Sequence, residues 1–378
     1  MEYSVISADC HIDLCWLPPE LFVSNASAAL KDRMPHVVDG PKGPQWCTRS
    51  VPLLGLVNSM GSMGREYVPG EIHRADRMAS TGLYADGRRG IRRCSDPDLR
   101  LADQDRDGVQ AEVLYGVLGV GGRMKDPEAS AEVFRIYNEW LVEFQRRHPD
   151  RYAGLACVPN SDIAVAVREI HHATRAGLKG VVMALNTATM TLWDLEWEPL
   201  WTAAEESGLP LSFHTVGSLS HLQSVAPQHA RIAFAVYMAG FQLAVADFLT
   251  SVIYSGVLER HPQLTIVLAE SGIGWIPYHL ERLDQEWEEQ FRDLPIRMKP
   301  SEYWRRQMVA TYQQDRIGIR LLDALGEDNV MWGSDFPHPD GVWPDSQETL
   351  REQLLALPKP VRHKVVCGTA ARLYGFVR

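Results

Sequence analysis

The chain has few cysteines, and their spacing does not suggest a disulfide framework or a local zinc site. The six cysteines are scattered through the 378 residues without a C-x-x-C pair, which is typical of reduced thiols in a cytoplasmic protein. The sequence has no uninterrupted apolar run long enough to span a bilayer. Its opening MEYSVISADC lacks the basic and apolar regions of a signal peptide. We therefore expect a cytoplasmic protein that does not associate with a membrane.

Basic residues are also in the minority. The 38 Lys and Arg residues against 48 Asp and Glu residues give a formal net charge of −10, whereas nucleic-acid and anionic-membrane surfaces select for clustered basic residues. The sequence lacks a GxxxxGKS/T phosphate loop, a GxSxG elbow and a GxGxxG turn that opens a helix after a strand. These absences argue against nucleic-acid binding and leave a small molecule as the expected partner.

What the sequence does contain, from about residue 102 onward, is a regular alternation of apolar strands and amphipathic helices. One helix is expected after Asp126 as N-cap, with Pro127 at its first position. Apolar strands separated by such helices predict a parallel sheet covered on both faces, and eight βα units close a barrel. We predict an α/β fold, a (β/α)8 TIM barrel, in preference to a doubly wound open sheet. The eight strands are expected to start near residues 4, 111, 153, 179, 210, 264, 308 and 329.

Residues 16–100 interrupt this alternation with many prolines and glycines and contain no convincing periodic element. We predict one domain over residues 1–378, with 16–100 as a long insertion after strand 1 that caps the barrel mouth. An apolar lid would favour a bulky hydrophobic substrate, although a compact insertion on the side of the barrel explains the same composition. The apolar residues that suggest a lid are Trp16, Trp46, Met60, Met63 and Tyr67.

Metal-ligating side chains follow four of the predicted strands. Asp9 and His11 end strand 1 two residues apart, so they project to the same face. His214, Glu270 and Asp335 end strands 5, 6 and 8, and the carboxyl ends of barrel strands meet at one rim. Any one of these residues alone is best explained as a polar strand end in water. Together they predict a site for a divalent metal ion, which suits zinc, manganese or iron.

Several segments resemble the amidohydrolase superfamily, in particular its aminocarboxymuconate-semialdehyde decarboxylase-like branch, amidohydrolase family 2. They are the D-x-H motif of strand 1, HPQLTIVLAESGIGWIPYHLERLD around strand 6, WGSDFPHPDGVWP around strand 8 and CGTAARLYGF near the carboxyl terminus. The resemblance covers residues 4–15 and 102–378. It implies that Asp9, His11, His214 and Asp335 are metal ligands and that Asp335 also transfers a proton. Related barrels often dimerise, so a homodimer is expected as well.

The chain departs from the family pattern at three positions. Many family decarboxylases have a histidine at the end of strand 6, where this chain has Glu270 in AESG. Thr369 stands where asparagine is common, a change that we cannot interpret. Strand 4 ends at Asn186, whereas the dinuclear branch of the superfamily has a lysine whose carbamate bridges two metals. Glu270 therefore has three interpretations: a catalytic base, an additional metal ligand, or the partner of a nearby arginine.

Two further histidines lie on loops that leave the predicted strands. His338 follows Asp335 by three residues, and we assign it a catalytic role. His221 follows strand 5, and we expect it to bind substrate together with Asn186 and Trp275. Cys10 is expected to face away from Asp9 and His11 and to pack as a small apolar residue.

These residues support three hypotheses of function. The first is a metal-dependent hydrolase or decarboxylase of a small to medium, bulky apolar organic substrate, in which Asp335 is the acid and base and one or two metal ions are bound. The second is a nonheme diiron monooxygenase with Glu270 as an additional ligand. The third, a non-catalytic barrel, is disfavoured because every expected ligand is present.

Overall fold

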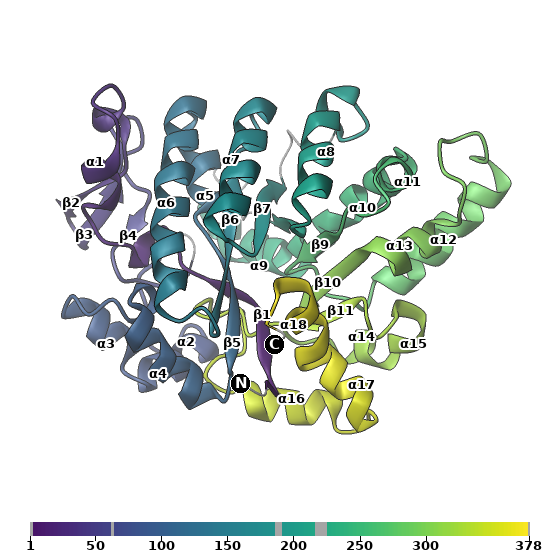
Figure 1. Cartoon of the computed structure of the whole chain (residues 1–378). Coiled ribbons are helices and arrows are strands. Elements are labelled where there is room, and N and C mark those ends of the chain that lie inside the picture. Colours follow the sequence, from purple (N-terminus) through teal and green to yellow (C-terminus); the bar gives the residue numbers. More distant parts are fainter. Residues whose placement is uncertain (1–2, 62–63, 186–190, 216–224, 377–378) are drawn as a thin grey trace.

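The structure, a computed structural model, describes residues 3–61, 64–185, 191–215 and 225–376. Eight parallel strands hydrogen-bond in the order β1-β5-β6-β7-β8-β9-β10-β11, and helices surround them (Figure 1). The strands are β1 (Ile6–His11), β5 (Ala111–Tyr115), β6 (Tyr152–Val158), β7 (Gly180–Leu185), β8 (Leu211–Thr215), β9 (Ile266–Ala269), β10 (Met308–Tyr312) and β11 (Val330–Trp332). Their positions confirm the predicted eight-stranded (β/α)8 barrel.

The barrel closes between its first and last strands through the backbone that follows β11. The amide of Asp335 donates to the carbonyl of Asp9 at 2.8 Å, and the amide of His11 donates to the carbonyl of Phe336 at 2.7 Å. This contact needs a glycine at position 333, because a Cβ there would lie 2.5 Å from the Cβ of Asp9. The sequence GSD therefore brings the end of β11 directly against the end of β1.

The helices after β5 run in chain order around the barrel, and α6, α7 and α8 stand side by side outside the strands in Figure 1. The Asp126 side chain accepts from the Ala129 amide, and Pro127 begins α6, which confirms the predicted helix start. The helices are α5 (Leu118–Met124), α6 (Pro127–Arg147), α7 (Ile163–Ala176), α8 (Glu198–Ser207), α9 (Ala230–Gly240), α10 (Val245–Tyr254), α11 (Val257–Arg260), α12 (Ile276–Glu289), α13 (Pro300–Gln307), α14 (Arg316–Arg320), α15 (Leu322–Leu325), α16 (Ser346–Leu354), α17 (Lys359–His363) and α18 (Thr369–Tyr374).

The segment between β1 and β5 is more regular than the sequence indicated. It contains a three-stranded antiparallel sheet of β2 (His36–Gly40), β3 (Gly43–Cys47) and β4 (Gly55–Leu56), and the helices α1 (Leu21–Asn25), α2 (His73–Ser80), α3 (Leu83–Arg88) and α4 (Pro97–Asp107). The prediction of no periodic element was therefore wrong. Most of these elements are shorter than the eleven or so residues over which periodicity becomes visible.

Most of the residues that suggested an apolar lid over the barrel mouth are buried. Trp16 and Trp46 are fully buried, and Met60 is buried as well. Tyr67 stacks on Tyr84 and donates to Asp76, and Met63 lies outside the described residues. These tryptophans fill the interior of the segment because large aromatic side chains gain most from burial.

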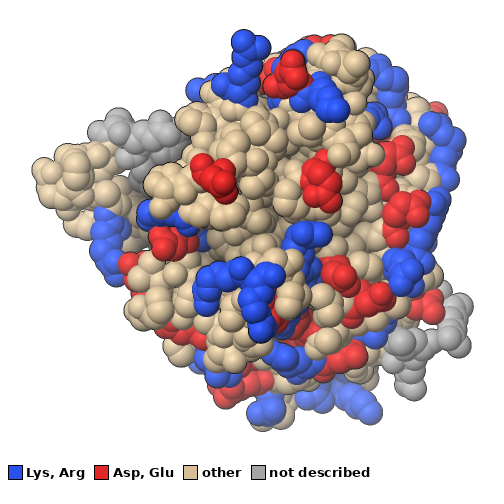
Figure 2. Space-filling view, turned by 90° about the vertical axis from the view of Figure 1, so that its left-hand side faces the viewer, with Lys and Arg blue, Asp and Glu red and all other residues tan. Residues whose placement is uncertain are grey.

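The surface carries charges of both signs, and basic and acidic side chains are interspersed on the face shown in Figure 2. One helical stretch, Pro227–Tyr254, is long and apolar enough to cross a membrane by length and composition alone, with a mean hydropathy of 1.7 in its most apolar window. It contains no long uninterrupted apolar run because Gln242 and Asp247 divide the stretch.

Candidate metal centre and substrate pocket

Four predicted ligands meet at the carboxyl ends of the barrel strands. His11 Nε2 lies 3.3 Å from Asp9 Oδ1 and 3.1 Å from Asp335 Oδ1. His214 Nε2 lies 3.8 Å from the same Asp9 oxygen. The structure thus brings together side chains that are more than 300 residues apart in sequence, at the rim where the strand order predicted them.

These side chains leave polar atoms without hydrogen bonds in the interior. In the described part of the chain, Asp9 Oδ1, His11 Nε2, His214 Nε2 and both carboxylate oxygens of Asp335 are buried and have no hydrogen-bond partner. The nitrogen–oxygen distances between these atoms are short enough for ion pairs, but their geometry is not that of hydrogen bonds. Because buried polar atoms are normally satisfied, such a cluster is suited to hold a bound group.

The cluster fits a divalent metal ion. Two ligands that each lie about 2.1 Å from one tetrahedral ion are about 3.4 Å apart, and the observed separations of 3.1 to 3.8 Å bracket that value. Asp9, His11 and His214 each offer one ligand atom, and these three atoms all lie within 4.8 Å of one another. Carboxylate and imidazole donors suit zinc, manganese and iron.

Hydrogen bonds outside the cluster hold the ligands in place. His214 Nδ1 contacts the carbonyl of Thr215 at 2.6 Å, which leaves Nε2 as the lone-pair donor. Asp9 Oδ2 accepts from Thr311 Oγ1 at 2.8 Å and from the amide of Glu270 at 3.1 Å, so only Oδ1 faces the cluster. This arrangement of supporting contacts is typical of metal sites.

Glu270 and Asp335 both adopt left-handed backbone conformations, with φ of 51° and 58°. Non-glycine residues rarely adopt positive φ, and such strain is concentrated at functional sites. Here it turns each carboxylate inward at the end of its strand. Glu270 Oε2 lies 3.6 Å from His214 Nε2, and its carboxylate also groups with those of Asp335 and Asp340.

The pKa values of these groups are strongly shifted. Burial raises the pKa of Asp9, but its contacts with His11 and His214 hold it well below its usual range. Burial, followed by the charges of Asp335, Asp340 and Asp9, raises the pKa of Glu270 well above its ordinary value. Such opposed shifts in neighbouring carboxyl groups are characteristic of functional sites.

His338 lies between two carboxylates. Its Nδ1 is 3.0 Å from Asp335 Oδ1, and its Nε2 is 2.8 Å from Asp13 Oδ2. Burial lowers the pKa of His338, but Asp335 and Asp13 together raise it well above its ordinary value. The ring also stacks on His11, with centroids 4.0 Å apart, so Asp13 fixes His338 and His338 in turn fixes Asp335.

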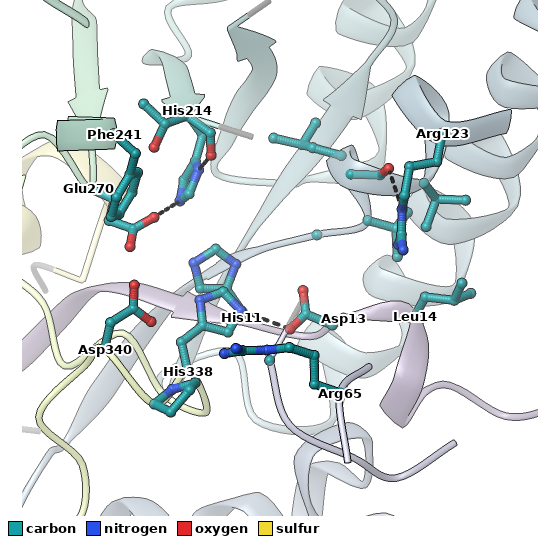
Figure 3. A pocket seen from close by; sticks show the side chains of 18 of the residues that line it. His11, Asp13, Leu14, Arg65, Arg123, His214, Phe241, Glu270, His338 and Asp340 are labelled. Atoms are coloured by element: carbon teal, nitrogen blue, oxygen red, sulfur yellow. Dashed lines mark hydrogen bonds and ion pairs between the residues drawn. The ribbon is translucent and has the colours of Figure 1, made fainter. Parts of the chain in front are cut away.

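A pocket opens in front of the cluster (Figure 3), with Glu270 and Asp340 on one side and Asp13, Arg65 and Arg123 on the other. Its apolar wall includes Val117, Leu118, Val120, Phe234, Tyr237, Met238 and Phe241. Arg123 donates to the carbonyls of Gly119 and Leu54. The pocket therefore combines an apolar wall with two cations beside the candidate metal centre.

Of the three predicted substrate contacts, Trp275 alone falls within the described residues. His221 and Asn186 lie outside the described residues. Trp275 is not among the lining residues in the described part of the chain, and its indole nitrogen donates to the carbonyl of Ser271. Cys10 is buried and donates to Ser7 Oγ, which confirms its predicted packing role.

Sequence reasoning missed Asp13, Arg65, Arg123 and Asp340. Asp13 continues the alternation of Asp9 and His11, and Asp340 follows His338 by two residues, so their spacing offered a signal. The two arginines offered none, because Arg65 lies in an irregular stretch and Arg123 in the short helix α5, and the position of both over the mouth depends on tertiary packing.

Comparison with known proteins defines the family. The family model described as amidohydrolase matches residues 8–376. The chain belongs to the amidohydrolase family. The predicted resemblance to its decarboxylase branch is confirmed by the relatives that follow.

The chain is 24% identical to 2-amino-3-carboxymuconate-6-semialdehyde decarboxylase from Dictyostelium discoideum, over 75% of this chain and 77% of that protein. It is also similar to the crystal structure of 5-carboxyvanillate decarboxylase LigW from Sphingomonas paucimobilis, with 25% identity, a TM-score of 0.67 and all of both chains covered.

A second 5-carboxyvanillate decarboxylase structure, from Novosphingobium aromaticivorans, contains manganese and 3-methoxy-4-hydroxy-5-nitrobenzoic acid. It is 21% identical with a TM-score of 0.66, and covers 81% of this chain and 85% of that one. The comparisons support a metal-dependent enzyme and lend no support to the diiron monooxygenase alternative.

Proposed function

We propose that this amidohydrolase is a metal-dependent decarboxylase of a small aromatic carboxylic acid. The observation that carries the proposal is the buried cluster of five polar atoms without hydrogen bonds, placed at the floor of a pocket with an apolar wall. The relatives named above are decarboxylases, and one of them binds manganese with a substituted benzoic acid.

Asp9, His11, His214 and Asp335 would hold the ion, because their free atoms converge with ligand-like spacing. Manganese is the first choice on the strength of the related structure. When bound, a divalent ion supplies positive charge that stabilises an oxyanion on the substrate.

The pocket provides matching contacts for an aromatic acid. The rings of Phe234 and Phe241 offer apolar surface for a flat ring, while Arg65 and Arg123 offer cationic donors for an anionic substituent. Arg65 already stacks over Phe234, with its guanidinium carbon 5.3 Å from the ring centroid, so the cation is positioned at the edge of the apolar wall.

Decarboxylation breaks the bond between the ring carbon and the carboxyl carbon, releases carbon dioxide and leaves an electron pair on the ring carbon, which then takes a proton. Glu270 lines the pocket, and one of its carboxylate oxygens lies within 4.8 Å of a carboxylate oxygen of Asp335. Both carboxyl groups are therefore candidates to deliver that proton. We propose that Glu270 delivers the proton and that the Asp13–His338 pair orients Asp335.

The test is carbon dioxide release from a panel of hydroxylated benzoic acids, using protein loaded with manganese, protein treated with chelator, and the His214→Ala variant. We expect release only from the loaded protein, with about one manganese per chain by elemental analysis. Hydrolysis of esters or amides without carbon dioxide release would assign the site to a hydrolase instead.

Glu270→Gln separates the remaining interpretations of that residue. If Glu270 carries the proton, the variant should still bind the metal, and its kcat should fall at least about 100-fold. Loss of manganese from the variant would instead make Glu270 a ligand.

A further inference from the structure

Three acidic residues line the substrate pocket, and two of them already have a partner. Asp13 Oδ2 lies 2.8 Å from His338 Nε2, and Glu270 Oε2 lies 3.6 Å from His214 Nε2. Asp340 also lines the pocket but forms no ion pair with another residue in the described part of the chain. Its carboxylate is therefore available to a molecule bound in the pocket.

The loop that carries Asp340 is tightly folded. The amide of Val342 donates to the carbonyl of Ser334 at 2.9 Å, and the amide of Gly341 donates to the carbonyl of His338 at 3.2 Å. Residue 341 must be glycine, because a Cβ there would lie 2.4 Å from the carbonyl oxygen of Ser334. These contacts hold the backbone of Asp340 in one place, so that its carboxylate is a preorganised hydrogen-bond acceptor.

The charges of the pocket are divided between its two sides. Figure 3 shows Glu270 and Asp340 together on one side and Arg65 on the other. The guanidinium of Arg65 lies over the ring of Phe234, at the edge of the apolar wall. A flat ring bound along this wall would meet a cation at one edge and carboxyl groups at the other. The substituent that suits the acidic side is a hydrogen-bond donor.

The spacing of the carboxyl groups favours a donor with two hydrogens. One carboxylate oxygen from each of Glu270, Asp335 and Asp340 lies within 4.8 Å of the other two. With hydrogen bonds of about 2.9 Å, the two N–H groups of one amino group can bridge oxygens that lie up to roughly 5 Å apart. A hydroxyl group has one hydrogen, so its oxygen would face the second carboxyl group with a lone pair.

We propose that Asp340, together with Glu270, binds an amino group on the ring of the substrate, which is then an amino-substituted aromatic acid. This inference rests on the proposed function and adds the substituent that the pocket selects. Glu270 can accept this hydrogen bond even when it carries a proton, because a protonated carboxyl group keeps acceptor capacity on its other oxygen. Asp340 supplies the negative charge, and Glu270 supplies the second acceptor.

The experiment measures binding to the manganese-loaded full chain by isothermal titration calorimetry. The probes are meta-nitroaniline, meta-nitrophenol and meta-nitroanisole, which differ only in an amino, a hydroxyl or a methoxy group. Their nitro group has the shape of a carboxylate but cannot leave as carbon dioxide, so binding is measured without turnover. We expect nitroaniline to bind at least about 10-fold more tightly than nitroanisole, with nitrophenol between them.

Variants of Asp340 test whether this residue causes the preference. Asp340→Leu removes the acceptor at similar volume and should weaken the binding of nitroaniline about 10- to 100-fold, while nitroanisole changes less than about twofold. Asp340→Asn keeps one acceptor oxygen and should recover part of the loss. Asp293→Leu, at an exposed aspartate outside the pocket, is the matched control. Circular dichroism and the manganese content confirm that each variant is folded and loaded.

Three results would overturn the proposal. They are a wild type that binds nitroaniline no more tightly than the other two probes, an Asp340→Leu variant that keeps the wild-type preference, and a variant in which all three probes are weakened equally. The last result would mean that Asp340 acts only through Glu270. If no aromatic acid released carbon dioxide but the nitroaniline preference still depended on Asp340, the proposed decarboxylation would fail and the amino-binding role would stand.

Discussion

Two groups of buried charged side chains both contact β1, and they differ in whether the chain supplies an arginine as counter-charge to the carboxylate. In the first group, Arg100 donates to Glu112 Oε2 at 2.6 Å, and Gln104 donates to the same oxygen at 2.8 Å. Both groups retain buried polar atoms without hydrogen bonds, Arg100 Nη2 in the first and the inward atoms of Asp9, His11, His214 and Asp335 in the second. Arg100 also donates to the backbone carbonyl of His11 at 3.0 Å, so the two groups share a strand.

The difference separates a structural charge from a functional one. The guanidinium of Arg100 is fully buried but has a carboxylate of opposite charge supplied by the chain itself. The cluster at the mouth has several carboxylates and imidazoles whose inward atoms need a ligand from outside the chain. Burial alone does not distinguish the two groups; the presence of an internal counter-charge does.

The largest expected effect comes from removing a ligand of the mouth cluster. His11→Ala is expected to lower kcat/KM on the order of 1000-fold and to abolish manganese retention, because one electrostatic stabiliser at a reacting centre contributes about that much. Elemental analysis and carbon dioxide release measure the two effects. Since His11 would no longer hold the ion, retention of a full equivalent of manganese by the variant would show that His11 is not a ligand.

The next effect concerns the group in which Glu112 is the counter-charge of Arg100. Glu112→Gln leaves Arg100 buried without its counter-charge, and the free energy of unfolding is expected to fall by about 3–5 kcal/mol. Urea denaturation measures it. The control is Glu143→Gln, which breaks an exposed i,i+3 pair with Arg146 and should change stability by about 1 kcal/mol or less. Equal effects in the two variants would show that the buried pair is no more than a surface ion pair.

Arg123→Met tests whether a cation beside the barrel mouth binds the substrate. A hydrogen bond to a charged group contributes about 1.5–3 kcal/mol, so KM should rise between about 10- and 100-fold while kcat changes little. Arg316→Met, at an exposed arginine paired with Glu352, is the matched control. A fall in kcat at unchanged KM would place Arg123 in a role other than substrate binding.

The last prediction concerns the pH dependence of the buried carboxyl group of Asp107. Burial, opposed by hydrogen bonds from Ser346 and assisted by the charges of Glu112 and Asp345, raises the pKa of Asp107 to about 7. The folded state then binds this proton more tightly than the unfolded state does. This group therefore costs no stability below about pH 4, and its cost grows as the pH rises to about 7.

Asp107→Asn replaces the titrating carboxyl group with an amide that does not titrate. Relative to wild type, the variant should gain stability between pH 4 and pH 7, by at most about 4 kcal/mol since each pKa unit corresponds to about 1.4 kcal/mol. Urea denaturation of both proteins at pH 5 and pH 8 gives the difference. A constant gap between the two proteins at both pH values would show that Asp107 does not titrate in this range.

How much of the fold and the site could be predicted from the sequence depended on the length and regularity of each element. The barrel followed from eight buried strands, and the mouth ligands followed from their position at strand ends, because parallel strands deliver their carboxyl ends to one rim. The small sheet β2–β3–β4 was missed because its strands are short. Arg65 and Arg123 were missed because one lies in an irregular stretch and the other in the short, glycine-rich helix α5, so neither belongs to a pattern long enough to place it.

The sequence by itself therefore determined the barrel, the family and the set of strand-end residues that converge, since these depend on local periodicity and on motifs of fixed spacing. Only the tertiary structure decided that His338 lies between Asp13 and Asp335, that Trp16 and Trp46 pack inside the inserted segment, and that α9 presents one apolar face to the pocket and another to solvent. Those facts depend on which distant segments meet, and the pairing of distant segments is set by packing of the whole chain and not by any local pattern.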